Sequence, residues 1–253
     1  MKEYVIYKND KKPIIYEITY EHDDYLIITG INYRIQRKVK KYETEKAKEV
    51  DIDTKKTNFA FLNNKFRNKK YVLGTILHID ADKNYLDKCL ELYKEMGIHA
   101  YSVLTNESDI SKVASNINLE VEPDVVVITG HDYYNNEDKK ALENYANTIN
   151  FIKGMKEFKK KFPNSVYIVG ACQSNFEALI ANGANFASSP KRINVHIYDP
   201  AIIAIKVSTT AYNKIVNFDS LSNVIENLND AYGGIETMGK MRILYWKENV
   251  KCK

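Results

Sequence analysis

Two apolar runs of strand length, each leading to a reactive side chain, constrain this chain more than any other feature. Residues 125–129 lead to His131, and residues 166–169 lead to Cys172. In an open parallel sheet the carboxyl ends of the strands meet at one edge, so neighbouring strands here would bring the imidazole and the thiol together. An imidazole beside a thiol can take its proton, and the thiolate is the nucleophile. The chain is therefore a candidate cysteine enzyme.

An alternation of strands and helices surrounds these runs from residue 71 onward. We predict strands over residues 73–79, 100–104, 125–129, 166–169 and 195–198, and helices over residues 82–96, 108–119, 148–162 and 176–182. Apolar residues recur at helical spacing in the first helix, and glycine or proline ends three of the helices. Repeated crossovers of this kind predict an α/β fold in which a parallel sheet lies between two layers of helices. We interpret residues 233–237 as a loop.

The first part of the chain has a different pattern. Short β-prone runs alternate with polar turns over residues 1–45, which predicts a small β-rich module built as an antiparallel sheet or barrel. Residues 46–70 are rich in Lys, Glu and Asp, which is typical of a solvated helix or a linker. We therefore expect an N-terminal module at 1–45, a charged linker at 46–70 and an α/β domain at 71–253.

Composition and charge argue against several classes of protein. No apolar run approaches the ~20 residues of a membrane-spanning helix, and no secretory signal is present, so we expect a cytoplasmic protein without a membrane partner. The three cysteines, Cys89, Cys172 and Cys252, have unrelated spacings, which argues against a disulfide framework or a Cys-x-x-Cys site. The net charge of +4 comes from residues spread along the chain, unlike the basic cluster of a nucleic-acid binder.

Seven blocks, in order, between Gly74 and Ile243 resemble the YabG family of sporulation-specific peptidases. The blocks are residues 77–82, 85–90, 128–132, 170–177, 183–190, 192–196 and 233–237. The His131 and Cys172 blocks also resemble, more loosely, caspase-like cysteine peptidases. The resemblance implies a caspase-like three-layer peptidase domain at 71–253. It also implies a cysteine endopeptidase that cleaves spore-coat or other sporulation proteins after arginine, in the mother cell, without a cofactor.

The same resemblance implies roles for individual residues. Cys172 would attack the scissile carbonyl, and His131 would assist proton transfer to the leaving amine. The main-chain N–H groups of Cys172 and Asp132 would hold the oxyanion, and the Asp132 side chain is a candidate to orient His131. The expected substrate-binding residues are Asp80, Asp82 and Asp199, as acidic partners for an arginine, and Gln173.

Three alternatives stay open at this point. His78, Asp80 and Asp82 alternate along one strand and could bind a divalent metal, although Asp82 could instead cap the next helix. A ligand-binding or phosphotransfer domain could use the same carboxylates. The chain could also be a non-enzymatic spore-coat scaffold with Cys172 buried, because free cysteine is among the most buried residue types.

An arginine-directed peptidase must also avoid destroying itself. The chain has five arginines, and Arg67 lies in the polar segment before the first strand of the α/β domain. Exposed connections of this kind are the preferred sites of nicking. We therefore expect any self-cleavage to occur after Arg67, and as a second choice after Arg34 or Arg37.

Overall fold

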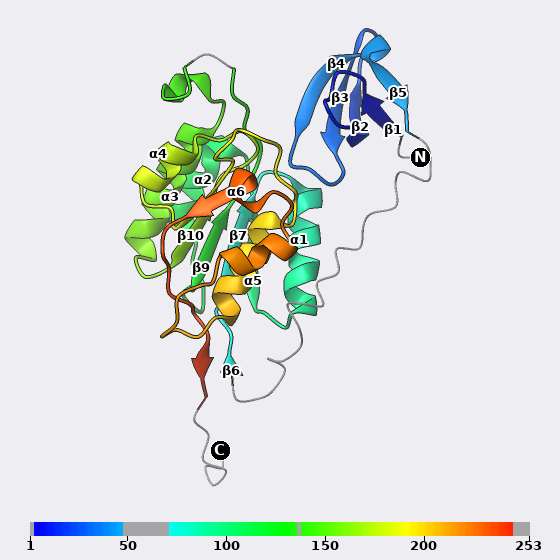
Figure 1. Cartoon of the computed structure of the whole chain (residues 1–253). Helices are drawn as coiled ribbons and strands as arrows, with labels where there is room; N and C mark the ends of the chain where they lie inside the picture. The colour runs from blue at the N-terminus through cyan, green and yellow to red at the C-terminus, as the bar shows by residue number, and fades with distance from the viewer. Residues whose placement is uncertain (1–2, 48–70, 136–137, 245–253) are drawn as a thin grey trace.

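The computed structural model describes residues 3–47, 71–135 and 138–244. These residues form a five-stranded N-terminal sheet, a six-stranded central sheet and a two-stranded sheet near the chain ends (Figure 1). The two-stranded sheet pairs β6 (Tyr71–Val72) with β13 (Arg242–Ile243). Among the described helices, none is long and apolar enough to cross a membrane.

The N-terminal sheet is antiparallel throughout and has the strand order β4-β3-β2-β1-β5. Its strands are β1 (Tyr4–Tyr7), β2 (Ile15–Glu21), β3 (Tyr25–Gly30), β4 (Gln36–Lys40) and β5 (Thr44–Lys46). This is the small antiparallel sheet that the sequence predicts. The last strand reaches Lys46 and the next residue, Ala47, is buried, so the module continues past residue 45. Residues 48–70 of the expected linker lie outside the described residues.

The central sheet has the order β12-β11-β10-β9-β7-β8, and only β12 runs antiparallel to its neighbour. Its strands are β7 (Ile76–Asp80), β8 (Ala100–Leu104), β9 (Val125–Ile128), β10 (Val166–Val169), β11 (Phe186–Ser188) and β12 (Tyr232–Gly234). Strands β7, β9 and β10 are buried along their whole length, as continuous apolar strands are when helices cover both faces.

Helices cover both faces of the central sheet and make a three-layer α/β domain (Figure 1). The helices are α1 (Lys83–Glu95), α2 (Ile110–Asn116), α3 (Thr148–Lys161), α4 (Phe176–Ala181), α5 (Asp199–Thr209) and the short α6 (Leu228–Ala231). One apolar core joins α1 and α5 to the sheet, and a second joins α2, α3 and α4 to its other face. The predicted α/β fold with its N-terminal β module is therefore confirmed.

Two predictions about the later part of the chain are wrong, and one strand was missed. Residues 195–198 are not a strand of the central sheet, because the fifth parallel strand is β11, which was not predicted. Val195 and Ile197 look like strand residues because they are buried, but the only described bridge in this run joins His196 to Tyr33 of the N-terminal module. Residues 233–237 begin in β12 and are not simply a loop.

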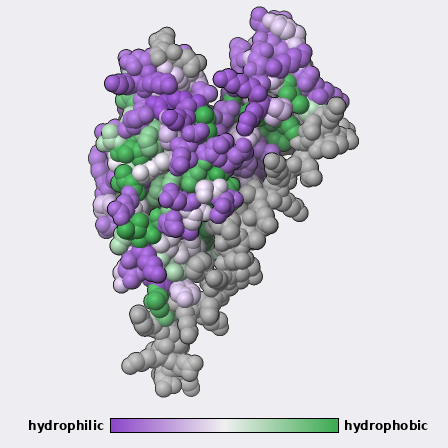
Figure 2. Space-filling view, viewed as in Figure 1, coloured by the Kyte–Doolittle hydropathy of each residue, from purple (hydrophilic) through white to green (hydrophobic). Residues whose placement is uncertain are grey.

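The helix predicted over residues 108–119 is also shorter and begins differently. A 3-10 turn, η4 (Glu107–Asp109), precedes α2, and no side-chain cap closes its start. Three further short 3-10 segments, η1 (Lys41–Glu43), η5 (Leu142–Asn144) and η6 (Asp219–Asn223), lie in connections. The face seen in Figure 2 is mostly hydrophilic over both the N-terminal module and the α/β domain, with apolar residues scattered between.

Candidate active site

Each of three neighbouring strands is followed, after the same number of residues, by a polar side chain. Ile79, Ile128 and Val169 are aligned across β7, β9 and β10 by the register of the sheet. Three residues beyond them lie Asp82, His131 and Cys172. Parallel strands end at a common edge, so this register brings a carboxylate, an imidazole and a thiol to one side of the domain.

The imidazole of His131 lies between the first turn of α1 and the loop after β9. Its Nε2 is 3.3 Å from Oδ2 of Asp82, and its ring lies 5.7 Å from the ring of Tyr85. The His131 N–H donates to the Glu107 carboxylate at 2.7 Å. Gly130 is needed for space, since a Cβ there would stand 2.7 Å from the same carboxylate. Among the described residues, the buried Nδ1 of His131 has no hydrogen-bond partner.

Cys172 lies in the turn that follows β10. Gly170 has a φ of +114°, and a Cβ there would clash with the Ser188 hydroxyl at 2.4 Å. Any other residue would therefore strain this turn. The thiol accepts a hydrogen bond of 3.1 Å from the Val195 N–H and is 1% exposed. Burial raises the pKa of Cys172 to about 12. The thiol is therefore neutral in this arrangement.

Asp132 does not contact the imidazole of its neighbour. Its buried carboxylate accepts hydrogen bonds from the hydroxyls of Thr148 and Ser174 and from the N–H groups of Tyr133 and Asn147. Burial raises the pKa of Asp132, and these four donors oppose the rise. Because Ser174 belongs to the Cys172 turn, the carboxylate joins the two loops that carry the imidazole and the thiol.

Gln173 makes a second link between the same two loops. Its side-chain carbonyl accepts a hydrogen bond of 3.2 Å from the Tyr134 N–H. Its own N–H donates to Ser189 Oγ at 3.0 Å. The backbone of Gln173 has a φ of 60°, in the left-handed region that is uncommon for a side chain of this size. The turn after Cys172 is thus fixed by several contacts.

The carboxylate of Asp80 binds an arginine of the N-terminal module. Arg34 Nη1 lies 2.5 Å from Asp80 Oδ2, and both side chains are fully buried. The guanidinium also donates to the Ile197 carbonyl, at 3.3 Å from Nε and 3.1 Å from Nη2. It packs 5.3 Å from the centre of the Tyr85 ring, and Nη2 lies 3.5 Å from Cys89 Sγ. This pocket therefore fits an arginine side chain.

Arg34 and Asp80 each stabilise the charged form of the other. Burial alone would lower the pKa of Arg34, but the Asp80 carboxylate raises it above its ordinary value. Burial alone would raise the pKa of Asp80, but Arg34 holds it well below its usual range. Breaking such a pair by removing one partner typically costs about 3–5 kcal/mol, because the other charge stays buried.

The other two acidic candidates have different surroundings. Asp82 caps α1, accepting hydrogen bonds from the N–H groups of Asn84 and Tyr85. Asp199 is the first residue of α5 and accepts a hydrogen bond of 3.1 Å from the His196 N–H. Burial raises the pKa of Asp199 to about 8. Of the three, only Asp80 holds a guanidinium among the described residues.

The side chains considered for a metal site form an internal hydrogen-bond chain. His78 Nδ1 lies 2.9 Å from the Tyr93 hydroxyl, and Nε2 lies 3.0 Å from the Thr129 hydroxyl. Thr129 in turn donates to Asp80 at 2.8 Å. Within the described part of the chain, no group of three His, Cys, Asp or Glu residues is placed to hold a metal ion.

Sequence reasoning missed several residues of this site. Glu107 directly precedes the helix predicted over residues 108–119, and Ser174 belongs to the block at 170–177, so their polar character was a usable signal. Arg34 gave none, because nothing in a β-rich module indicates that one of its turns reaches a pocket made by β7 and α1.

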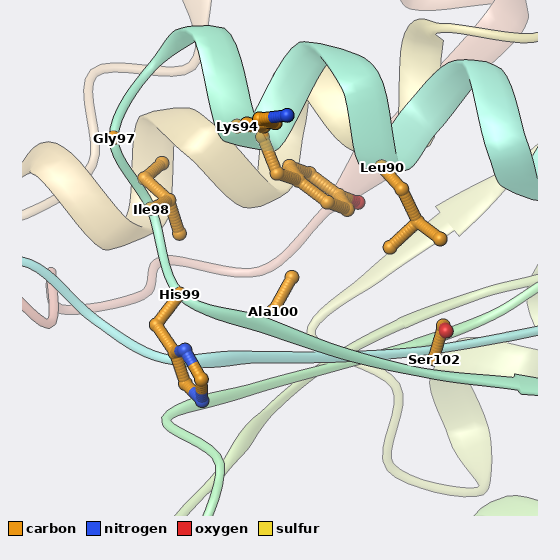
Figure 3. A pocket seen from close by; sticks show the side chains of 8 residues that line it. Leu90, Lys94, Gly97, Ile98, His99, Ala100 and Ser102 are labelled. Carbon is orange, nitrogen blue, oxygen red and sulfur yellow. The ribbon is translucent and has the colours of Figure 1, made fainter.

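A hollow of the described surface lies elsewhere. It is lined by residues of α1, of the turn after it and of the start of β8 (Figure 3). These residues include Leu90, Lys94, Ile98 and His99. Because β8 begins here, the hollow lies at the opposite edge of the sheet from His131 and Cys172.

Comparison with known proteins identifies the family. The family model described as YabG peptidase U57 matches residues 30–245. The chain belongs to the YabG peptidase family. The sporulation-specific protease YabG of Bacillus subtilis (strain 168) is 39% identical over 176 residues, which cover 67% of this chain and 60% of that YabG protein. No solved structure matches the chain. The matched region of the family begins before Arg34, so the turn that enters the Asp80 pocket lies inside it.

Proposed function

We propose that this chain is a cysteine endopeptidase that cleaves after arginine. The observation that carries the proposal is the common register that places Asp82, His131 and Cys172 at one edge of the sheet. Membership of the YabG peptidase family and the name of the Bacillus subtilis relative, a sporulation-specific protease, support peptidase activity.

In the proposed reaction Cys172 attacks the scissile carbonyl and His131 passes a proton to the leaving amine. Asp82, which lies against Nε2 of His131, holds the ring in place. The main-chain N–H groups of Cys172 and Asp132 would stabilise the oxyanion. Asp132 and Gln173 position the two loops, and no cofactor takes part.

Asp80 is the residue that we propose reads the substrate arginine. The buried guanidinium of Arg34 supports this proposal, because it contacts a carboxylate, a main-chain carbonyl and an aromatic ring in this pocket. A bidentate or charge-assisted partner of this type is how proteins recognise arginine.

We infer a role in sporulation from the relative. We propose that the substrates are spore-coat or other sporulation proteins and that the enzyme acts in the mother cell, in contact with the forming coat. The name of the Bacillus subtilis protein supports the sporulation role.

The burial of Cys172 favours a second candidate, a non-enzymatic coat scaffold. The two functions differ in a simple assay. The full chain, Cys172→Ala and His131→Ala are compared on a fluorogenic peptide amide ending in arginine and on its citrulline counterpart, which has the same shape without the charge. We expect cleavage of the arginine peptide that both substitutions reduce to the uncatalysed rate. Activity of Cys172→Ala equal to that of the parent would exclude Cys172 as the nucleophile.

A further inference from the structure

The turn between β3 and β4 reaches across to the α/β domain. Tyr33 and His196 form an antiparallel bridge. The Arg34 N–H donates to the Val195 carbonyl at 2.9 Å, and the Ile197 N–H donates to the Asn32 carbonyl at 3.1 Å. Residues 32–34 therefore add a short strand to residues 195–197, which is the way an extended peptide is bound along an exposed edge.

This added strand passes beside the candidate nucleophile. The Val195 N–H donates to Cys172 Sγ, and the carbonyl of the same residue accepts the Arg34 N–H. The Arg34 backbone and the thiol thus share Val195 as a neighbour. From this backbone position the Arg34 side chain descends into the Asp80 pocket.

Further contacts hold the turn in place. The Tyr85 hydroxyl lies 2.7 Å from the Gly30 carbonyl and 2.9 Å from the Tyr33 carbonyl. Lys88 Nζ donates to the Ile31 carbonyl at 2.9 Å. The Tyr33 and His196 rings meet edge to face, 5.7 Å apart. With the turn in this position Arg34, Asp80 and Cys172 are all buried.

We propose that residues 32–34 occupy the subsites of a substrate, with Arg34 in the place of the residue before the scissile bond, so that the N-terminal module is a built-in inhibitor of the site. The inference rests on the proposed peptidase function and extends it. It also explains why a candidate nucleophile is buried and neutral. We call the place beside Asp80 and Cys172 that the turn occupies the cleft. A substrate can reach Cys172 only after the turn has left it.

The test loosens the turn in the full-length chain and follows two readouts. The first is the rate at which iodoacetamide alkylates Cys172 at neutral pH, located by peptide mapping so that other thiols do not interfere. The second is cleavage of the arginine peptide. Tyr33→Ala removes the ring contact with His196 without leaving a buried charge. Arg34→Ala empties the pocket, and because it can also destabilise the chain it is used beside Tyr33→Ala rather than alone.

Lys41→Ala is the matched control, because it removes an exposed side chain of the same module that pairs with Glu21 at 2.6 Å, away from the cleft. We expect Tyr33→Ala to raise both the alkylation rate of Cys172 and kcat/KM at least tenfold, and Lys41→Ala to leave both at the level of the parent. Cleavage of the parent between Arg34 and Ile35, absent in Cys172→Ala, would also support the placement of the turn.

The outcomes separate this inference from the peptidase proposal. If folded Tyr33→Ala and Arg34→Ala alkylate at the rate of the parent and cleave no faster, the turn is only a structural joint and the inference is wrong. If alkylation accelerates but no variant cleaves any peptide, the turn covers Cys172 as inferred, and the proposed peptidase function is wrong.

Discussion

Ser174 donates a hydrogen bond of 2.9 Å to Asp132, so one buried carboxylate holds the loop after β10 against the loop after β9. From the sequence alone, the Asp132 side chain is a candidate to orient His131 directly. The geometry supports an indirect role, in which Asp132 sets the distance between the loops that carry His131 and Cys172.

Asp132→Ala is expected to lower both stability and peptidase activity. The substitution leaves the buried hydroxyls of Thr148 and Ser174 without their acceptor, at a cost of about 1.5–3 kcal/mol in the free energy of unfolding. Urea denaturation measures this cost. Asp87→Ala, which removes an exposed carboxylate paired with Lys83, is the control and should change stability by less than about 0.5 kcal/mol. Equal stability of the two variants would contradict the role assigned to Asp132.

Asp80→Asn is expected to reduce the preference for arginine. Loss of one charge-assisted partner costs about 1.5–3 kcal/mol, or roughly ten- to a hundredfold in kcat/KM. The measured quantity is the ratio of kcat/KM for the arginine and citrulline peptides within one variant, because any change in how often the Arg34 turn leaves the cleft cancels in that ratio. Asp199→Asn should keep the ratio of the parent. An unchanged ratio in Asp80→Asn would mean that another group reads the substrate.

Asp82→Asn should lower kcat about tenfold with little change in KM or in stability. Asparagine caps a helix as well as aspartate does, so α1 should be retained. The charge beside Nε2 of His131 is lost, however, and the ring is then less firmly held during proton transfer. Asp82→Ser is the companion variant, because serine also caps but is too short to reach the imidazole. A rise in KM at constant kcat would instead place Asp82 in substrate binding.

Asp199 should make stability depend on pH. Its pKa is about 8 in the folded chain and close to 3.8 when unfolded, so the folded chain retains a proton that the unfolded chain releases. The contribution of Asp199 to the free energy of unfolding is therefore greatest below about pH 4. It is lost as pH rises toward 8, at up to about 1.4 kcal/mol per pH unit. Asp199→Asn lacks this dependence. Unfolding free energies of both chains at several pH values should diverge in favour of the variant, and parallel curves would refute the assignment.

The parts of the fold that sequence predicts best are those governed by local pattern. The strands at 100–104 and 166–169 have the predicted bounds, because a short apolar run between two turn signals indicates a strand and also marks where it ends. Strand β11 was missed because its three residues, Phe186–Ser188, are too few to show a pattern. Residues 195–198 were misread because their burial comes partly from the N-terminal module, which a local pattern cannot reveal.

The residues of the site divide in the same way: a local pattern reveals some of them, and only the tertiary structure reveals the others. His131, Cys172, Asp80 and Asp82 were found because each follows a strand whose pattern is visible. Asp199 was named for its place after residues 195–198, which are not a strand of the central sheet. The contact of Arg34 with Asp80 joins residues 46 positions apart in the chain, one in the turn between β3 and β4 and the other at the end of β7, and only the tertiary structure brings them together. Self-cleavage after Arg67 stays a prediction, because that residue lies outside the described residues. Arg34 and Arg37 differ in their surroundings: the first is buried, whereas the second pairs with Asp10 inside the module.

Because the turn that carries Arg34 is covalently joined to the domain it covers, its local concentration at the cleft does not change when the protein is diluted. Tethered segments of this kind act at an effective concentration in the millimolar range when the linker is short and flexible. A free peptide with ordinary affinity would therefore compete poorly, and the degree of blockage would be the same in a cell with few copies as in one with many. Onset of activity would then be set by an event that releases the module, such as cutting of the tether or capture of the module by another surface, and not by the amount of the protein that has been made.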